Sequence, residues 1–474
     1  MKWEQLLCEK RQTPSKSGSK TDRRNEFQKD YHRIICSASF RRLQDKTQVF
    51  PLDNSDFVRT RLTHSLEVAY FAKSLGQIAF QYLIENNRDA EITPEIEEKV
   101  CSILECAGLL HDIGNPPFGH FGEDSIRNWF KNNLSKVKYK GVSVESYLNE
   151  QMRNDLYHFE GNAQALRLLT KLHYLVDENG MHLSYALLNT LIKYPVSSCD
   201  IDKDSGNIKD KKMGYYFAEQ ELFDDITGST GAIDCRYPLT YLLEAADDIA
   251  YHTADIEDAV KKGYLSYSQL LEELKSEKYI DKCANEQELQ SYKTAVNMLE
   301  EKYDKAKEKG MPNPELNAVQ NWIIYVQGML LSCASFGFTK NYQSIMNGTF
   351  AQEVMAVSYG NALSEALAKI AANYVFCSSK IYKTEIAAGN MINFLLDKFV
   401  AAAVKYDTDD KLSPMDKRMI HLISDNYLQI YKIYSDGKDE NEKLYLRLLL
   451  VTDYICGMTD GFAKRLYQEL NGII

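Results

Sequence analysis

The sequence predicts an all-α protein in which many helices are joined by turns and long polar loops. Apolar residues recur at spacings of three and four over most of the 474 residues, which is the period of one helix face. Alternating patterns typical of strands are short and few, and residues 215–218 are the best candidate. Helical periodicity marks residues 60–85, 95–113, 158–174, 181–193, 238–262, 285–309, 315–333, 350–375, 382–404, 415–435 and 440–470.

Three polar stretches interrupt this helical pattern, and one of them, residues 309–314 (KGMPNP), is the best candidate for a domain boundary because it contains a glycine and two prolines. Residues 11–24 (RQTPSKSGSKTDRR) indicate a mobile lead-in, which we assign to residues 1–25. Residues 197–214 (SSCDIDKDSGNIKDKKMG) indicate a long loop between helices that could cover a site. The expected architecture is therefore a helical protein with long polar loops.

The composition is that of a globular protein with an ample core, because 44% of the residues are hydrophobic and 26% are charged. No run of about 18 apolar residues suggests a membrane span, and the charged start does not resemble a signal peptide, so a cytoplasmic location is expected. The ten cysteines form no CxxC pair, which suits reduced, buried thiols and not a thiolate zinc site. The net charge of −11 disfavours broad affinity for nucleic acid or membranes; an anionic substrate would need a local positive field.

The most informative run is residues 108–117 (GLLHDIGNPP). An apolar helix ends in the adjacent residues His111 and Asp112, and a glycine and two prolines then stop it. Polar ligands at a helix end suit a metal site, because imidazole and carboxylate project from a rigid scaffold. Taken alone, the pair is better explained as an ordinary capped helix end.

Two further residues complete an ordered pattern. His64 follows Arg61 by about one turn, so both side chains project from one face, and Asp247 lies among apolar neighbours on another predicted helix. The order His64, His111, Asp112 and Asp247 resembles that of the HD-domain phosphohydrolases. The resemblance implies a helical HD fold in which these four residues bind one divalent metal ion per site. We expect Mn or Mg, while ligands without thiolate also permit Fe, Co or Zn.

Further blocks are similar to the deoxyguanosine triphosphate triphosphohydrolase family within that superfamily. They extend from residue 40 to residue 460, and no motif is recognised between about 265 and 380. In order, the blocks are residues 40–51 (FRRLQDKTQVFP), 59–65 (RTRLTHS), 110–123 (LHDIGNPPFGHFGE), 159–164 (FEGNAQ), 191–195 (LIKYP), 244–251 (EAADDIAY) and 453–460 (DYICGMTD).

Enzymes of this family hydrolyse a deoxynucleoside triphosphate at its α-phosphorus, which releases the deoxynucleoside and tripolyphosphate. The resemblance implies the same activity here, with dGTP as the expected substrate. It also implies an HD core at residues 26–270 and a helical region at residues 271–474 that packs on the core and on neighbouring subunits of a homo-oligomer, often a hexamer. Some members are activated by a dNTP or single-stranded DNA at a separate site, although the acidic charge here does not support DNA binding.

The resemblance assigns a catalytic pair to His120 and Glu123. The two residues lie three positions apart at a predicted helix start, where a carboxylate can orient a histidine for proton transfer. Without the resemblance, Glu123 could merely favour a helix N-terminus. The sequence leaves open whether His120 activates water or protonates the leaving group.

The resemblance also assigns contacts with the triphosphate to Arg61, Asn162, Lys193 and Tyr194. Two cations and the metal would offset about four negative charges, the electrostatic arrangement expected in phosphoryl transfer. Read without the family, Lys193 is a lysine at a helix C-terminus that binds free carbonyl groups.

A sugar pocket is implied by residues on one helix face, where Asp247, Tyr251 and Asp255 recur every fourth position. In the family the tyrosine packs on the deoxyribose and the aspartate holds the 3′-hydroxyl, while Gln48 and Val49 match the opposite side of the pocket. A steric clash with a 2′-hydroxyl would then exclude ribonucleotides. The alternative is an amphipathic helix whose acidic residues face solvent, namely Asp248, Asp255 and Asp258.

Two other functions remain open from the residues. One is a different HD enzyme, such as a nucleotidase, a cyclic-nucleotide phosphodiesterase or a hydrolase of hyperphosphorylated guanosine, which would share the metal ligands but not the sugar and triphosphate blocks. The other is a nucleotide-sensing or DNA-binding regulator with a vestigial pocket. His120 and Glu123 disfavour the regulator, because a sensor need not retain groups for proton transfer.

Overall fold

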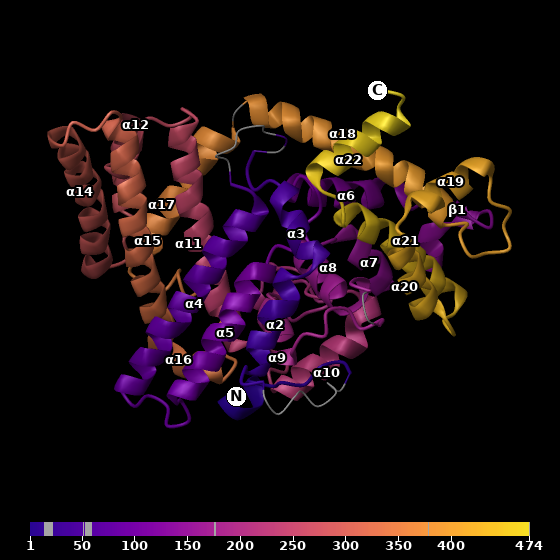
Figure 1. Cartoon of the computed structure of the whole chain (residues 1–474), viewed down its shortest axis with the longest axis horizontal. Coiled ribbons are helices and arrows are strands. Elements are labelled where there is room, and N and C mark those ends of the chain that lie inside the picture. Colours follow the sequence, from indigo (N-terminus) through magenta and orange to yellow (C-terminus); the bar gives the residue numbers. More distant parts are fainter. Residues whose placement is uncertain (14–21, 51, 53–58, 175–176, 378, 474) are drawn as a thin grey trace. The chain divides into compact units, whose positions relative to one another are not determined.

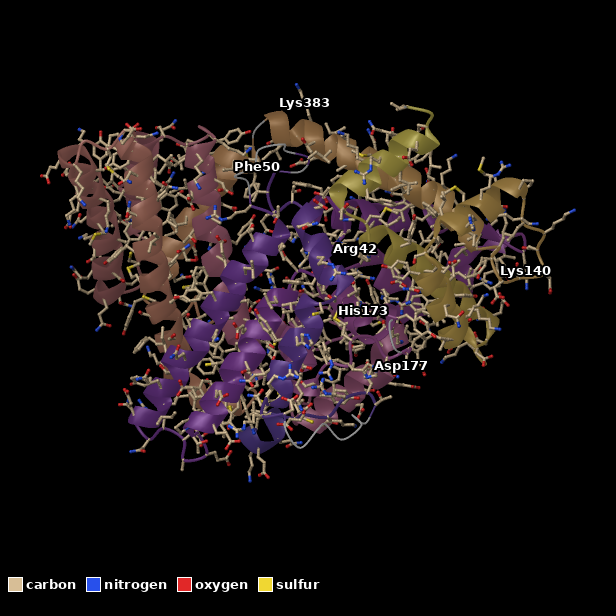
Figure 2. The ribbon with its side chains drawn as sticks, in the orientation of Figure 1. Arg42, Phe50, Lys140, His173, Asp177 and Lys383 are labelled. Carbon is tan, nitrogen blue, oxygen red and sulfur yellow. The ribbon has the colours of Figure 1, made fainter. Side chains whose placement is uncertain are left out.

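The computed structural model describes residues 1–13, 22–50, 52, 59–174, 177–377 and 379–473, and it confirms the all-α prediction. Within these residues the strands are β1 (Lys138–Tyr139) and β2 (Val142–Ser143), an antiparallel pair. The turn between them carries Lys140, labelled in Figure 2, and Gly141, both with positive φ. Residues 14–21 of the expected lead-in and Pro51 lie outside the described residues.

The chain forms two compact units, each assembled from separate segments. Unit 1 comprises Met1, Leu66–Gly108 and Pro238–Tyr382, and unit 2 comprises Lys2–Ser65, Leu109–Tyr237 and Lys383–Ile474. Three helices, α4, α5 and α18, contribute residues to both units.

In unit 1 the helices α11, α14, α15 and α17 pack against one another (Figure 1). The buried indole of Trp322 donates to the carbonyl of Ala295 at 2.7 Å and joins α15 to α14. The buried carboxylate of Glu288 on α14 accepts from the N–H of Ala362 at 2.8 Å, in the first turn of α17, where helices favour an anion. The helices with residues in this unit are α4 (Arg61–Glu85), α5 (Pro94–Leu110), α11 (Pro238–Lys261), α12 (Tyr267–Leu274), α13 (Glu277–Ile280), α14 (Glu286–Glu308), α15 (Pro314–Lys340), α16 (Tyr342–Met346), α17 (Asn361–Ala371), η6 (Ala372–Phe376) and the start of α18 (Ser379–Ala403).

Unit 2 has α21 (Glu440–Cys456) at its core. Every residue of α21 from Leu444 to Cys456 is buried, so this part of the helix is surrounded by protein on all sides. Two of these buried residues are charged and paired: Arg447 with Glu440, and Asp453 with Arg167. The other helices of unit 2 are α1 (Trp3–Leu6), α2 (Glu26–Ile35), α3 (Ala38–Arg41), η1 (Arg42–Asp45), α6 (His120–Asn133), η2 (Val144–Tyr147), α7 (Glu150–Tyr157), α8 (Gly161–Arg167), η3 (Leu168–Leu172), α9 (Tyr185–Leu191), η4 (Ile208–Asp210), η5 (Phe217–Glu219), α10 (Gln220–Thr230), most of α18, α19 (Pro414–Leu422), α20 (Asp425–Ser435) and α22 (Asp460–Leu470).

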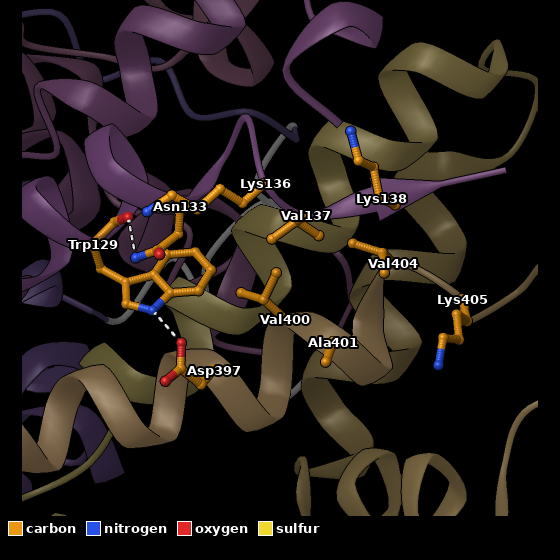
Figure 3. A pocket seen from close by; sticks show the side chains of 10 residues that line it. All are labelled: Trp129, Asn133, Lys136, Val137, Lys138, Asp397, Val400, Ala401, Val404 and Lys405. Atoms are coloured by element: carbon orange, nitrogen blue, oxygen red, sulfur yellow. Dashed lines mark hydrogen bonds between the residues drawn. The ribbon is translucent and has the colours of Figure 1, made fainter. Parts of the chain in front are cut away.

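A surface cavity of about 320 Å³ lies beside α6 and α18 in unit 2 (Figure 3). On its wall the indole of Trp129 donates to Asp397 at 2.7 Å, and Asn133 donates to the carbonyl of Trp129 at 2.9 Å. The hydrogen bond between Trp129 and Asp397 joins α6, the helix that begins at His120, to α18. The lining residues are Trp129, Asn133, Lys136, Val137, Lys138, Asp397, Val400, Ala401, Val404 and Lys405.

Several details differ from the sequence predictions. The prediction of a strand at residues 215–218 is wrong. The chain forms the 3₁₀ turn η5 there, and the N–H of Phe217 donates to Asp155 at 2.7 Å. Residues 415–435 and 440–470 each form two helices, α19 with α20 and α21 with α22, separated at Ile423–Ser424 and at 457–459. Residues 350–360 precede α17 without helix.

Two helical stretches, Pro314–Lys340 and Ile381–Ala403, are long and apolar enough to span a membrane by length and composition alone. In their most apolar windows, 61% and 50% of the residues are buried inside the protein, as in ordinary core helices. The ten cysteines form no disulfide, and only Cys106 and Cys456 are buried, fewer than expected.

Candidate active site

His64 and His111 come together at the ends of two helices. His64 lies in the first turn of α4, and His111 follows the last residue of α5. Both are buried, their ring centroids are 5.2 Å apart, and their ligand nitrogens lie within 4.8 Å of each other. Imidazole nitrogens bind metals at about 2.0–2.1 Å, so the two rings are close enough to hold one cation.

The close approach of α4 and α5 depends on Gly108, near the end of α5. A Cβ at this position would lie 2.4 Å from the Cα of Ala69, an atom of the α4 backbone. No side chain can be accommodated there without moving a helix. Glycine therefore sets the spacing of the two helices that carry the histidines.

Asp112 is held from two sides. One carboxylate oxygen, Oδ2, pairs with the guanidinium of Arg61, and the other, Oδ1, accepts from Nδ2 of Asn115 at 2.6 Å. Oδ2 also lies 3.5 Å from Nε2 of His111. Arg61 is only 3% exposed, so the residue expected to contact the triphosphate is already fixed beside an expected metal ligand.

These donors fit a divalent cation. Two buried imidazoles and a neighbouring carboxylate supply nitrogen and oxygen ligands without a thiolate, a set that Mn, Mg, Fe, Co and Zn accept to different degrees. The fourth expected ligand, Asp247, lies on α11 in unit 1 and is half-buried.

Lys46 supports this region, and sequence reasoning gave it no role. Its ammonium group is buried and donates to the carbonyls of Asn115 at 2.6 Å and Cys456 at 2.7 Å. Burial lowers the pKa of Lys46 to about 8. Nearby, Asp460 accepts from the N–H groups of Thr47 at 3.0 Å and Phe118 at 2.9 Å. The occurrence of these residues in the family blocks was the only available signal.

His120 and Glu123 contact each other in the first turn of α6. Nδ1 of His120 lies 3.0 Å from Oε2 of Glu123. The imidazole is 75% exposed whereas the Glu123 side chain is 3% exposed, so a buried carboxylate orients an exposed ring. Glu123 therefore does more than favour a helix N-terminus, because its carboxylate points inward and is bound.

The charges of this pair stabilise each other. The hydrogen bond that Nδ1 of His120 makes to the Glu123 carboxylate raises the pKa of His120 above its usual range, although partial desolvation of the ring opposes the shift. Burial alone would raise the pKa of Glu123, but the hydrogen bond and charge of His120 and the charge of Arg127 outweigh it, so the pKa lies below its ordinary value. The arrangement favours an imidazolium beside a carboxylate.

The remaining expected contacts of unit 2 differ in exposure. Asn162 is half-buried, and its amide donates to Oε1 of Glu160 at 3.0 Å. Lys193 follows the end of α9 by two residues, and its own carbonyl accepts from Nε of Arg236 at 2.8 Å. Of the other residues of unit 2 that are expected to contact the substrate, Gln48 is half-buried, and Val49 and Tyr194 are buried.

Tyr251 and Asp255 lie with Asp247 on α11 in unit 1. The ring of Tyr251 stacks on Phe376, with centroids 6.4 Å apart and an angle of 13° between the planes. Phe376 lies in the stretch where the sequence shows no motif. Asp255 and Asp258 are 2% and 3% exposed, so the alternative in which both face solvent is wrong.

A family model described as "HD domain" matches residues 61–157. The match begins at Arg61, includes both histidines and the His120–Glu123 pair, and ends at the last residue of α7. The chain therefore contains an HD domain.

Relatives identify the family within this class. The chain is 48% identical to the deoxyguanosinetriphosphate triphosphohydrolase-like protein of Listeria monocytogenes and 33% identical to that of Synechocystis sp., with both chains of each pair covered in full. It is 32% identical to the deoxyguanosinetriphosphate triphosphohydrolase of Yersinia enterocolitica, with 96% of each chain covered. The chain belongs to the deoxyguanosine triphosphate triphosphohydrolase family of HD phosphohydrolases, which confirms the resemblance drawn from the sequence blocks.

Proposed function

We propose that the protein hydrolyses deoxynucleoside triphosphates, with dGTP as the preferred one, to the deoxynucleoside and tripolyphosphate. The observation that carries the proposal is the buried Glu123 carboxylate bound to the exposed His120 ring, because a protein that only binds nucleotides has no need of a proton-transfer pair. The name of the Yersinia enterocolitica relative supports dGTP as the substrate.

The metal ligands in this proposal are His64, His111, Asp112 and Asp247. When bound, a divalent ion, Mn²⁺ or Mg²⁺ by preference, polarises a phosphate oxygen and lowers the cost of negative charge that develops at the α-phosphorus. The buried histidines bind it as neutral rings, and Asp112 supplies a charge that partly neutralises it.

Arg61 and Lys193 supply positive charge to the triphosphate, and Asn162 and Tyr194 supply polar contacts. Arg61 is held by Asp112, so its guanidinium does not have to be ordered when substrate binds. Such preorganised donors stabilise developing charge without reorganisation at the moment of reaction.

His120 moves the proton. Water adds to the α-phosphorus, the bond from that phosphorus to the 5′-oxygen breaks, and the departing oxygen takes up a proton. Because Glu123 binds Nδ1, the Nε2 of the exposed ring remains to exchange a proton with water or the leaving group. Glu123 stabilises the imidazolium in either case.

The sugar contacts in this proposal are Tyr251, Asp255, Gln48 and Val49. Tyr251 is backed by Phe376, which keeps its ring in one plane. A rigid ring against the deoxyribose would exclude a 2′-hydroxyl by steric conflict. Ribonucleotides are therefore expected to be poor substrates.

The test is to incubate the protein with Mn²⁺ or Mg²⁺ and each dNTP, and to separate the products by ion-exchange chromatography. Deoxynucleoside and tripolyphosphate are expected, and chelation should stop the reaction. Monophosphate with pyrophosphate, or orthophosphate alone, would contradict the proposal. Glu123→Ala should slow turnover by about 100-fold or more while metal stays bound, since general acid–base groups contribute about that much.

Regulation and assembly are tested by the same assay with pairs of dNTPs and by light scattering, respectively. We propose a homo-oligomer in the cytoplasm, a hexamer by family resemblance, with a dNTP or single-stranded DNA as an effector. Pairs of dNTPs, compared with single ones, would reveal an activating nucleotide, and light scattering would give the oligomeric state. A monomer with full activity and no response to pairs would contradict both parts.

A further inference from the structure

The carboxylate of Glu123 is bound by three donors, of which His120 is only one. Oε1 accepts from the N–H of Gly161 at 2.7 Å. Oε2 accepts from Nη2 of Arg127 at 3.3 Å, the same oxygen that contacts His120. Arg127 lies one turn after Glu123 on α6, so a single helix face presents the ring, the carboxylate and the guanidinium.

Arg127 is itself fixed by other groups. Its Nε donates to the carbonyl of Phe159 at 2.7 Å, and its Nη1 donates to Asp124 at 2.8 Å. Its Nη2 also donates to Oε2 of Glu160 at 3.3 Å. The planar guanidinium has donors in a rigid fork, so contacts at three of its nitrogens define its orientation.

We propose that Arg127 is a positioning residue, which holds the Glu123 carboxylate in the orientation that binds Nδ1 of His120. The proposal rests on the proposed role of His120 in catalysis. Arg127 itself has no contact with the reacting atoms in this account; it acts through Glu123.

Other charges among the described residues also act on this pair. The charges of Arg61 and Asp112 act on His120. Around Glu123 are Glu160, Lys212 and, farther into the core, Cys456. Lys212 donates to Oε1 of Glu160 at 3.1 Å, so it partly compensates the second carboxylate.

Removing Arg127 has two opposite effects on His120. Loss of a nearby cation would by itself raise the pKa of His120. Loss of the donor that fixes Glu123 leaves two adjacent buried carboxylates, Glu123 and Glu160, short of positive charge, which favours a proton on one of them. If positioning is the main role, His120 then loses its charged partner, and its pKa falls.

The experiment is an NMR titration of His120 in the resting, full-length protein labelled at histidine ring carbons, with the signal assigned by His120→Gln. In Arg127→Met the pKa of His120 should fall by about half a unit or more. Turnover of dGTP should fall by about 10-fold or more with KM changed less than about threefold, and the limb of the pH–rate profile that reports His120 should move to lower pH.

The matched control is Lys131→Met, which removes a cation from the next turn of α6 at an exposed position. It should leave the pKa of His120 and turnover as in the wild type. An unchanged or raised pKa in Arg127→Met, or an equal effect of Lys131→Met, would overturn the proposal. If Arg127→Met does not fold, Arg127→Gln, which keeps hydrogen-bond donors without the charge, should shift the pKa in the same direction.

The titration also separates this inference from the proposed function, because it needs no turnover. A protein that hydrolyses no dNTP but shows the fall in the pKa of His120 would keep the positioning role and lose the proposed function. A protein that hydrolyses dGTP without that fall in the pKa of His120 would keep the proposed function and lose the positioning role.

Discussion

His64 and His111 are both buried, and their ligand nitrogens lie within 4.8 Å of each other. A metal ion binds these rings only in their neutral form, so it competes with protons for them. The adjacent Asp112 is held by Arg61 and Asn115, which limits how far its carboxylate can turn away. Single side chains here have few alternative positions, so the loss of one ligand should be poorly compensated.

His64→Ala and Asp247→Ala should each abolish metal binding together with turnover. His421→Ala is a matched control, because His421 is exposed on α19. Metal content after dialysis, measured by mass spectrometry, and dGTP hydrolysis are the two measurements. Metal retained at the wild-type level in His64→Ala would contradict the proposed ligand set.

Residue identity predicts some contacts at this scale and misses others for a physical reason. A spacing of three places His120 next to Glu123, which the structure bears out as a contact. The same rule pairs Glu123 with Arg127 at a spacing of four, but on an exposed helix face that pair would be weak and ordinary. The contact between Glu123 and Arg127 matters because Glu123 is buried, and that burial depends on segments distant in the sequence, such as the one with Gly161.

At the scale of elements, α4 and α5 determine the separation of the histidines, and their packing depends on Gly108. Gly108→Ala should destabilise the protein by about 1–3 kcal/mol, the usual cost of excess volume in a packed interior. It should also weaken metal binding by about 10- to 100-fold, because the helices that carry His64 and His111 must separate.

The control for this change is Gly328→Ala, in a helical glycine position on α15 with open space around the added Cβ. It should be neutral or stabilise by up to about 1 kcal/mol, since alanine favours helix. Urea denaturation gives the free energy of unfolding, and calorimetric titration gives metal affinity. Equal effects of the two substitutions would show that the close approach at Ala69 is unimportant.

The sequence predicted helices with unbroken apolar periodicity well, but it did not predict where one helix ends and the next one begins. The pattern at residues 238–262 corresponds to α11 (Pro238–Lys261), because apolar and small residues continue through every turn. The pattern at 440–470 continues across Gly457, yet Thr459 caps a new helix by accepting from the N–H of Phe462. The spacing of apolar residues indicates which face of a helix is buried. It does not show where the chain changes direction between two helices that both have apolar faces.

At the scale of the whole molecule, each unit combines segments that lie far apart in the sequence. In unit 2, Arg167 pairs with Glu219 at 2.8 Å and with Asp453 at 2.8 Å, all three buried. Local composition gives no indication of such pairings, so their partners could not be predicted from the sequence. Loss of one member would leave an uncompensated buried charge.

Asp155 is expected to make the free energy of unfolding of the protein depend on pH. It is fully buried, accepts from Ser198, from the N–H of Phe217 and from Tyr445, and burial raises its pKa to about 7. Between the ordinary aspartate value near 4 and about 7 the folded state binds more protons than the unfolded state, so the free energy of unfolding contributed by this group falls as pH rises through that window.

Asp155→Asn should remove this contribution. Relative to the wild type, its free energy of unfolding should therefore improve as pH rises from 5 to 8, whatever the difference at pH 5. Urea denaturation at several pH values measures this difference. A difference between the two proteins that is constant across the window would show that Asp155 does not titrate there.

The hydrogen bond from Lys46 to the carbonyl of Cys456 joins residues 410 positions apart, and the contacts of Asp460 with Thr47 and Phe118 span similar lengths. A ribosome adds about 5–20 residues per second, so about 20–80 s separate the synthesis of these partners. During that time Lys46 has no carbonyl of Cys456 to bind, and the base of the active site is unfinished. A nascent or C-terminally truncated chain should therefore be inactive and depend on chaperones, even when every proposed metal ligand has already been made.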